Sequence, residues 1–474
     1  MSRAEAVLLT LIAYNVALLS IGFWASRRMN DTLDFFLGGR RLGGFVAAIS
    51  ASASSSSAWT LLGVSGAAYA WGLPALWLFP ATLLGFLVNW IWVAPRLMDL
   101  SRREEAVTLT DVIAGTGDSS LRPVIVGFSS FIILFSFLFY VAAQFQAAGH
   151  AFVSVFELSM LASVMTGAAV IVLYTLLGGF WAVSVTDTLQ GLLMAATAIA
   201  LPLVALAAVG GTDGLMQGLT AVRSPSDLPY APPHTAFAAA GFVIGTLGIG
   251  LGYPGQPHVV NRFMALDSSR SLSRGRVVAI SWALVIYAGM LVLGLCGRVL
   301  YPGAGHGEQV FFELANGLLS PVVAGVMIAA VLSAIMSTAD SQLLVAGSSV
   351  SQDWRLGESN SRRALLVSRI MVLALSVIAV LLALFAPQAI FSRVLFAWHA
   401  VGSAFGPVLV LRLAGCEIRP AAVLGSLAAG FGVTVIIHAF PDAPGDYIER
   451  LLPLALAFAI AWLGRVRGVM PAAD

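Results

Sequence analysis

The sequence contains no lysine, and charged residues make up only 10% of its 474 residues. A soluble domain carries about a quarter charged residues, whereas 59% of this chain is hydrophobic and its mean hydropathy is +0.92. A soluble fold cannot bury that much apolar surface, so the composition predicts an integral membrane protein. Cysteine is also scarce. Cys296 and Cys416 lie in separate apolar stretches without metal-ligand spacing, so we expect two free thiols rather than a disulfide or a metal site.

Apolar runs of about 20 residues, the length that crosses a bilayer as a helix, recur along the whole chain. The first run lacks a small-residue cleavage site, which favours a retained helix over a signal peptide. No segment between the runs is long enough to form a soluble domain, so residues 1–474 are expected to form a single all-α membrane domain. We predict about thirteen transmembrane helices, with approximate bounds 5–25, 43–70, 74–98, 123–148, 155–177, 180–209, 236–258, 277–299, 319–348, 365–386, 389–411, 420–439 and 449–466.

Arginine is distributed unevenly between the loops that join these runs. Arginine-rich loops alternate with loops that hold acids and isolated arginines, and the positive-inside rule places the arginine-rich loops in the cytoplasm. We therefore predict an external N-terminus and a cytoplasmic C-terminus, which requires an odd number of helices. The arginines assigned to the cytoplasmic side are Arg27, Arg28, Arg40, Arg41, Arg96, Arg102, Arg103, Arg122, Arg262, Arg270, Arg274, Arg276, Arg355, Arg362, Arg363, Arg412, Arg419, Arg465 and Arg467.

Two predicted helices contain residues that weaken a helix at mid-membrane depth. Residues 50–58 include six serines, whose hydroxyls compete for backbone partners, and residues 248–257 include four glycines and two prolines. Small residues also occur at kinks and tight helix contacts, which is the alternative interpretation. Here the two stretches each open a group of five helices, a pattern typical of inverted-repeat transporters with a midplane site. The repeats would be residues 43–209 and 236–411, with accessory helices in residues 1–30 and 420–466.

Asp187 and Asp340 are carboxylates inside predicted spans, where acids are rare. Each lies in an S-x-x-D-[ST] pattern, at residues 184–188 and 337–341, that puts two hydroxyls and a carboxylate on one helical face. This mixture of charge and neutral oxygens suits a dehydrated Na⁺. Proton coupling stays open, because two carboxylates that share a cavity without a cation favour protonation of one of them. The other alternative is that each aspartate ends a helix at a hydrated interface.

Motifs of other functional classes are missing from the sequence. There is no G-x-S-x-G turn, Walker loop or Ser/His/Asp set, and the six histidines are scattered without ligand spacing. Nothing resembles the selectivity filter of a channel. We therefore expect no enzymatic activity and no catalytic residues.

Four groups of long motifs occur in a fixed order along the chain. They are residues 34–40 (DFFLGGR), 178–190 (GGFWAVSVTDTLQ), 252–258 with 262–265 (GYPGQPH and RFMA), and 334–338 with 341–345 (AIMST and SQLLV). Together they resemble the solute:sodium symporter family, and within it the bacterial sodium/proline symporters, from about residue 30 to residue 410. The resemblance implies a LeuT-type fold with a five-plus-five inverted repeat. It also implies sodium-coupled import of a small solute across the bacterial inner membrane.

The resemblance also implies a set of binding residues. A Na⁺ site between the second and ninth helices would use backbone carbonyls of Ala53, Ser56 and Ala334 and the hydroxyls of Ser337 and Thr338. A possible second Na⁺ site would use Asp187, Ser337, Asp340 and Ser341. The solute would lie near Ser57, Ala58, Tyr253 and Pro257, with Tyr140 lining its cavity.

Three residues depart from the proline branch within these motifs. Ser55 stands where that branch has aspartate, Ile249 where it has tryptophan, and Ala58 where it has glycine. Asp340 on the facing helix would supply the charge that is missing at residue 55. We expect the solute to be proline or a related amino acid, with another carboxylate or osmolyte as the alternative.

The expected partners are the lipid bilayer, Na⁺ and the small solute, with no nucleic acid and no obligate protein partner. A second hypothesis is a transporter-like sensor that binds solute and signals through a partner. The roughly dozen residues after Trp462 carry no kinase motif, which favours transport over sensing.

Overall fold

The computed structural model describes residues 37–222, 236–303, 307–350, 361–440 and 444–466, except residues 118, 157, 178, 179 and 387, and also residues 5, 8, 9, 12–14, 16, 17 and 20. Every element described in these ranges is helical.

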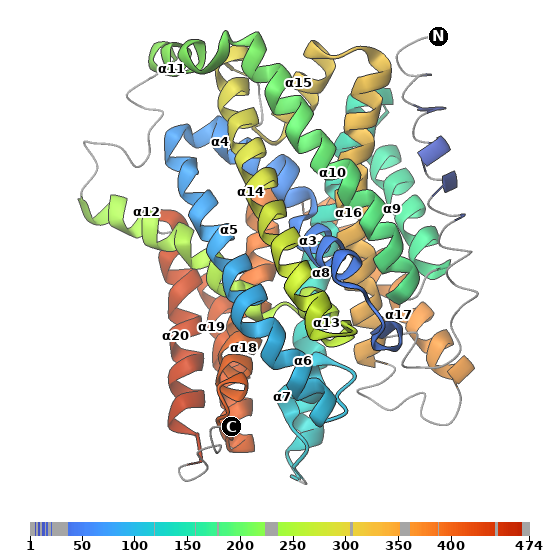
Figure 1. Cartoon of the computed structure of the whole chain (residues 1–474), viewed down its shortest axis with the longest axis vertical. Coiled ribbons are helices and arrows are strands. Elements are labelled where there is room, and N and C mark those ends of the chain that lie inside the picture. The colour runs from blue at the N-terminus through green and yellow to red at the C-terminus, as the bar shows by residue number, and fades with distance from the viewer. Residues whose placement is uncertain are drawn as a thin grey trace.

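The helices form one bundle, with α11 and α15 at one end and α6 and α7 at the other (Figure 1). In chain order the elements are η1 (Gly38–Arg40), α3 (Gly44–Ala58), η2 (Trp59–Val64), α4 (Ser65–Trp71), η3 (Leu73–Trp77), α5 (Leu78–Leu87), η4 (Val88–Val93), α6 (Ala94–Arg103), α7 (Leu109–Ala114), α8 (Arg122–Phe156), α9 (Met160–Leu177), α10 (Phe180–Ala208), α11 (Gly211–Ala221), α12 (Ala236–Gly248), η5 (Ile249–Gly255), α13 (Pro257–Ala265), α14 (Ser269–Leu300), η6 (Gly307–Gln309), α15 (Val310–Leu318), α16 (Pro321–Ser348), α17 (Ser361–Phe385), α18 (Ile390–Leu413), α19 (Pro420–Ile437), η8 (Pro444–Asp446) and α20 (Tyr447–Leu463).

Ten helical spans in the described ranges are long and apolar enough to cross a membrane. They match ten of the thirteen predicted runs. The predicted runs at 155–177 and 449–466 correspond to the helices α9, of 18 residues, and α20, of 17, which are not among these ten spans. The run at 5–25 lies mostly outside the described residues. The all-helical membrane class is confirmed, and the number thirteen stays a prediction.

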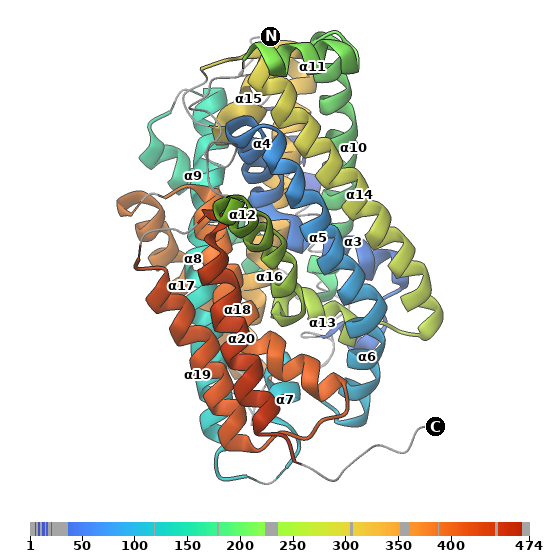
Figure 2. The ribbon, with the colours of Figure 1, turned by 90° about the vertical axis from the view of Figure 1, so that its left-hand side faces the viewer.

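Three spans are almost completely enclosed by the rest of the protein. The most apolar windows of the spans Gly44–Trp71, Pro321–Ser348 and Ile390–Leu413 are 89%, 83% and 94% buried, whereas those of α17 and α19 are 33% buried. In Figures 1 and 2, which are related by a 90° turn, α16 lies in the middle of the bundle. Enclosure explains how a serine-rich helix survives at this depth, because backbone and hydroxyl groups facing protein find partners that lipid cannot provide.

The first predicted break is confirmed at the end of α3. Ser57 has a φ of 30° and a ψ of −174°, which interrupts the helix, and a segment of wider turns, η2, follows it. The interruption changes the partners of two backbone N–H groups. Ala58 donates to Oε1 of Gln144 at 3.1 Å, and Trp59 donates to the hydroxyl of Ser57 at 3.1 Å as well as to the carbonyls of Ser56 and Ser57. Side-chain acceptors thus help to satisfy the backbone at the break, as a broken helix inside a membrane protein requires.

The second predicted break is confirmed between α12 and α13, where η5 takes the place of regular α-helix. Its freed carbonyls are also satisfied by side chains. The indole of Trp398 donates to the carbonyl of Ile249 at 3.2 Å, Gln256 donates to that of Gly252 at 3.1 Å, and Asn89 donates to that of Tyr253 at 3.2 Å. The break is therefore a fixed, fully partnered structure at these carbonyls rather than a loose kink.

Glycine lets η5 contact α18 backbone to backbone. A Cβ atom at Gly255 would lie 2.8 Å from the Cα of Gly402 on α18. That distance is shorter than real Cβ contacts, so any larger residue at 255 would separate the two elements. Cys296 is buried and Cys416 half-buried, and both are free thiols, as expected.

Candidate functional site

The predicted sodium residues meet where α3 packs against α16. The Thr338 hydroxyl donates to the carbonyl of Ser54 at 2.9 Å, and the Ser54 hydroxyl donates to the carbonyl of Ser337 at 3.2 Å. The Ser337 hydroxyl donates to the carbonyl of Ala334 at 3.3 Å. All of these residues are fully buried. The contact is therefore a cluster of neutral oxygens shielded from lipid, the donor set that a hard cation such as Na⁺ prefers.

Ala53 and Ser56 belong to the same buried stretch of α3. The Ser56 hydroxyl accepts a hydrogen bond from the indole of Trp282 on α14 at 3.0 Å. Ser52, one residue before Ala53, has a buried hydroxyl with no hydrogen-bond partner among the described residues. A buried hydroxyl without a partner is uncommon in proteins and is consistent with a nearby ligand. The residues present thus fit a Na⁺ site.

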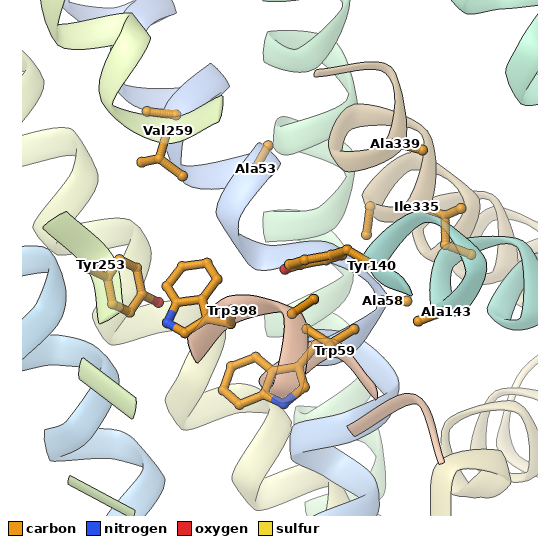
Figure 3. Close-up of a cluster of buried hydrophobic side chains, with 14 of the residues drawn as sticks. Ala53, Ala58, Trp59, Tyr140, Ala143, Tyr253, Val259, Ile335, Ala339 and Trp398 are labelled. Atoms are coloured by element: carbon orange, nitrogen blue, oxygen red, sulfur yellow. The ribbon is translucent and has the colours of Figure 1, made fainter. Parts of the chain in front are cut away.

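A small enclosed cavity lies beside this cluster, between the two helix breaks. Its volume is about 10 Å³, close to the smallest space that holds a water molecule. Aromatic rings close it: Tyr253 and Trp398 meet edge to face with centroids 4.6 Å apart, and Figure 3 shows Tyr140 and Trp59 converging on the same centre. The cavity is lined by Ser55, Trp59, Tyr140, Ile249, Tyr253, Val394, Leu395 and Trp398.

The predicted solute residues fall in or next to this cavity. Tyr140 and Tyr253 line it, and the Tyr140 hydroxyl donates to that of Ser57 at 3.3 Å. Ser57 and Ala58 form the break itself. Pro257 is buried at the first position of α13 and does not line the cavity.

Two of the three departures from the proline branch, Ser55 and Ile249, lie in the cavity wall. No charged side chain lines the cavity. A serine in place of an aspartate therefore makes this wall electrically neutral, and an isoleucine in place of a tryptophan changes its shape.

The predicted second cation site contains a side chain that sequence reasoning placed elsewhere. Arg262 was expected in an arginine-rich cytoplasmic loop. The structure contradicts this: Arg262 lies on α13 with only 1% of its side chain exposed, and its Nη2 contacts Oδ2 of Asp187 at 3.0 Å. The positive-inside rule counts arginines near the ends of spans. It cannot recognise one that a broken helix carries into the core.

Asp187 and Asp340 are both completely buried, so neither ends a helix at a hydrated interface. Asp187 also accepts from the hydroxyl of Ser50 at 2.6 Å, and its Oδ2 lies 3.2 Å from the hydroxyl of Ser54. Asp340 is less well partnered. Its Oδ1 lies 3.4 Å from the Ser341 hydroxyl, and its Oδ2 has no hydrogen-bond partner among the described residues.

Charged contacts also hold the two ends of α18. At its start, the carboxylate of Glu308 accepts the N–H groups of Ile390 and Phe391 at 3.1 and 2.8 Å, beside a cavity of about 550 Å³. At its end, Arg412 pairs with Glu104 at 2.7 Å. Burial raises the pKa of Glu104, and the charge of Arg412 opposes that shift. These contacts link α18 to η6 at one end and to the end of α6 at the other.

Several residues of the site were missed by sequence reasoning. Asn89, Gln144, Gln256 and Trp398 partner the two breaks, and Tyr287 bonds the Tyr253 hydroxyl at 3.0 Å. Asn89 and Gln144 could have been found from the sequence, because each is a polar residue within an otherwise apolar run.

A sequence profile of the sodium:solute symporter family matches residues 35–416. The chain belongs to this family. It is 35% identical to the osmoregulated proline transporter OpuE of Bacillus subtilis over 458 residues, which cover 94% of this chain and 92% of that protein. It is also 35% identical to the sodium/proline symporter of Salmonella typhimurium, over 92% of this chain and 88% of that protein.

Solved structures confirm the LeuT-type fold of this sodium:solute symporter. A Na⁺-coupled sialic acid symporter in its substrate-bound outward-open state superimposes with a TM-score of 0.79, at 17% identity, and the match covers 97% of both chains. The transporter MhsT in complex with L-phenylalanine gives a TM-score of 0.53 at 13% identity, over 89% of this chain and 98% of that one. The chain is thus a sodium-coupled secondary transporter of a small solute, not an enzyme. It is a multi-pass protein of the inner membrane, with Na⁺ as its coupling ion.

Proposed function

We propose that this symporter imports proline or a closely related amino acid, driven by Na⁺. The observation that carries the proposal is the small aromatic cavity between the two helix breaks, directly beside the oxygen cluster of α3 and α16. Relatives that are about one third identical to this chain are named as proline transporters or sodium/proline symporters. A small ring with one carboxylate and one ammonium group suits aromatic walls next to polar backbone, and these walls, which enclose only about 10 Å³ in this structure, must separate to admit it.

We propose that Na⁺ binds the carbonyls of Ala53, Ser56 and Ala334 and the hydroxyls of Ser337 and Thr338. The solute would bind near Ser57, Ala58, Tyr140, Tyr253 and Pro257. On α3, the proposed ion residues Ala53 and Ser56 directly precede the break, and the proposed solute residues Ser57 and Ala58 form it. Ion binding that fixes α3 against α16 therefore also fixes the solute residues, which gives the two ligands a favourable coupling free energy.

The same proposal includes the organisation of the chain. Residues 43–209 and 236–411 would be the two inverted repeats, flanked by accessory helices in residues 1–30 and 420–466. The N-terminus would be external and the C-terminus cytoplasmic. No obligate protein partner is needed for transport.

The neutral cavity wall supports a second candidate. Ser55 and Ile249 replace residues of the proline branch in the wall itself, so another small carboxylate or a methylated osmolyte is the alternative solute.

Uptake into proteoliposomes tests the proposal. Labelled proline should accumulate when an inward Na⁺ gradient is imposed, and should not accumulate with choline in place of Na⁺ or after an ionophore dissipates the gradient. Competition by unlabelled amino acids, betaines and small carboxylates ranks the solutes. Stronger competition by a compound outside the amino acids would reassign the solute, and solute binding without any flux would favour the sensor hypothesis.

A further inference from the structure

Arg262 is the most completely engaged charged side chain near the predicted cation sites. Its Nε donates to the hydroxyl of Ser50 at 3.0 Å, and its Nη1 donates to the carbonyl of His258. Its Nη2 faces three oxygens: Oδ2 of Asp187 at 3.0 Å, the hydroxyl of Ser341 at 2.6 Å and that of Ser54 at 3.2 Å. The guanidinium also lies over the ring of Phe180, with its carbon 5.2 Å from the ring centroid.

Two of these oxygens, on Asp187 and Ser341, belong to residues that the family resemblance assigns to a second Na⁺. The implied ligand set was Asp187, Ser337, Asp340 and Ser341. In the structure, Asp187 and Ser341 both contact a guanidinium nitrogen. A positive charge already lies at contact distance from them, and a Na⁺ placed among the same oxygens would meet strong like-charge repulsion in a buried site. The residues therefore do not fit a second Na⁺ while Arg262 holds this position.

We propose that Arg262 is a tethered cation that fills the second sodium site, so that the chain couples solute import to one Na⁺. The proposal rests on the ion sites given under the proposed function. Charge balance agrees with it. Asp187 and Asp340 bring two negative charges and Arg262 one positive charge, and one Na⁺ at the α3–α16 cluster neutralises the remainder. The carboxylate of Asp340 is not among the hydrogen-bond partners of Arg262, and its Oδ2 atom has no partner among the described residues.

The position of Arg262 on the chain gives this cation a second property. It stands in α13, five residues after Pro257 and directly beyond the second break. Its contacts on Ser50 and Ser54 lie in α3, just before the first break. A guanidinium fixed by covalent structure therefore joins α13 to α3, and its contacts with Asp187 and Ser341 also reach α10 and α16, the two helices that the implied second ion would join.

Equilibrium binding of ²²Na⁺ to the purified full-length protein, without solute, tests the proposal directly. Wild type should bind one Na⁺ per chain, with a hyperbolic dependence on Na⁺ concentration. Two bound ions would overturn the proposal. Because no solute is present, the result does not depend on whether proline is transported. Two bound ions together with Na⁺-driven proline uptake would overturn this inference and leave the proposed function standing. One bound ion without proline uptake would support this inference and overturn the proposed function.

An Arg262→Gln variant provides the matched test. Without the guanidinium, Asp187 and Asp340 need another cation, so a second Na⁺ should bind in competition with protons and the binding curve should become sigmoidal, with a Hill coefficient rising from about 1 toward 2. Arg393→Gln is the control, because Arg393 is equally buried (2% exposed) but bonds Gln146 on α8, at 3.1 Å. It should still bind one ion. A single hyperbolic site in Arg262→Gln would contradict the proposal.

Chemical rescue covers the case in which Arg262→Gln does not fold. In Arg262→Ala, free guanidinium at about 10 mM should raise the melting temperature by several degrees, because it binds the vacated oxygens of the native state. Tetramethylammonium, which has no N–H donors, should not. Equal shifts by both cations in Arg262→Ala, or an equal guanidinium shift in wild type, would overturn the proposal.

Discussion

The hydroxyl of Thr338 joins the two helices that hold the proposed sodium site. It reaches across to the carbonyl of Ser54, 284 positions away in the sequence, at 2.9 Å. Both residues are fully buried, so the carbonyl has no access to water if the hydroxyl is removed. A buried polar group that loses its partner costs about 1–3 kcal/mol. The same hydroxyl is a proposed Na⁺ ligand, so its loss should weaken Na⁺ binding as well as the contact between α3 and α16.

Replacing Thr338 by valine should raise the Na⁺ concentration for half-maximal uptake by roughly tenfold, because the shape is kept and the hydroxyl is lost. Thr338→Ser keeps the hydroxyl and should stay within about twofold of wild type. The measurement is initial uptake at fixed solute over a range of Na⁺ concentrations. An unchanged Na⁺ dependence in the valine variant would remove Thr338 from the site.

At the scale of the residue, sequence reasoning recovered the polar groups of α3 and α16 but not their partners. Asp187 and Asp340 stood out because carboxylates are rare in membrane spans, and both are buried as this implied. Arg262 did not stand out, since many arginines flank the spans and the rule that assigned it uses loop position alone. Its ion pair with Asp187 joins positions 75 apart, and no local pattern encodes that contact.

On one side of the cavity, a glycine of α5 makes room for the ring of Tyr253. A Cβ atom at Gly85 would lie 2.2 Å from Cδ2 of the Tyr253 ring, so the absence of a side chain at 85 makes room for that ring. The ring also contacts Phe86, with centroids 5.3 Å apart. The second break is thus held in place by a neighbouring helix as well as by its own glycines and prolines.

A Gly85→Ala substitution should displace Tyr253 and weaken solute binding by at least tenfold, with a smaller effect on Na⁺ binding to the empty protein. Gly127→Ala on α8 is the control, because a Cβ atom there has nothing within 4 Å. The solute concentration for half-maximal uptake and the ²²Na⁺ binding curve separate the two effects. Equal behaviour of the two alanine variants would show that the Tyr253 ring has no fixed position.

At the scale of the element, both breaks were predictable because their causes are local. Six serines and a glycine–proline run weaken a helix wherever they occur. The side chains that stabilise the breaks were not predictable. Gln144 and Asn89 come from α8 and η4, 86 and 164 positions from the groups they bond. Only the packing of the bundle brings them there.

The whole molecule has a predicted orientation that one native cysteine can test. Cys416 is half-buried between α18 and α19, close to Arg412 and Arg419, in a loop expected to be cytoplasmic. A membrane-impermeant maleimide should label it in inside-out vesicles and not in right-side-out vesicles. Cys416→Ser removes the signal and serves as control, since Cys296 is buried. Labelling from the outside would reverse the proposed orientation.

For the whole molecule, composition and hydropathy were enough to predict the membrane class, and the motifs were enough to predict the family and fold. The exact helix count was not. The helix α20 has 17 residues, one fewer than α19, the shortest of the ten spans, so length alone does not separate a crossing helix from a peripheral one.

The buried pair between Asp187 and Arg262 also constrains how the protein is made. A chain grows from its N-terminus, so α10 with Asp187 enters the membrane before Arg262 has been synthesised. Until α13 arrives, the carboxylate lacks its counter-charge, and Arg262 in turn enters at a cost of about 2.5–3.5 kcal/mol unless that carboxylate is waiting. The first half of the chain therefore serves as a template for inserting the second. A nascent chain arrested before residue 262 should be captured by insertion chaperones or degraded, rather than released as a stable half-transporter.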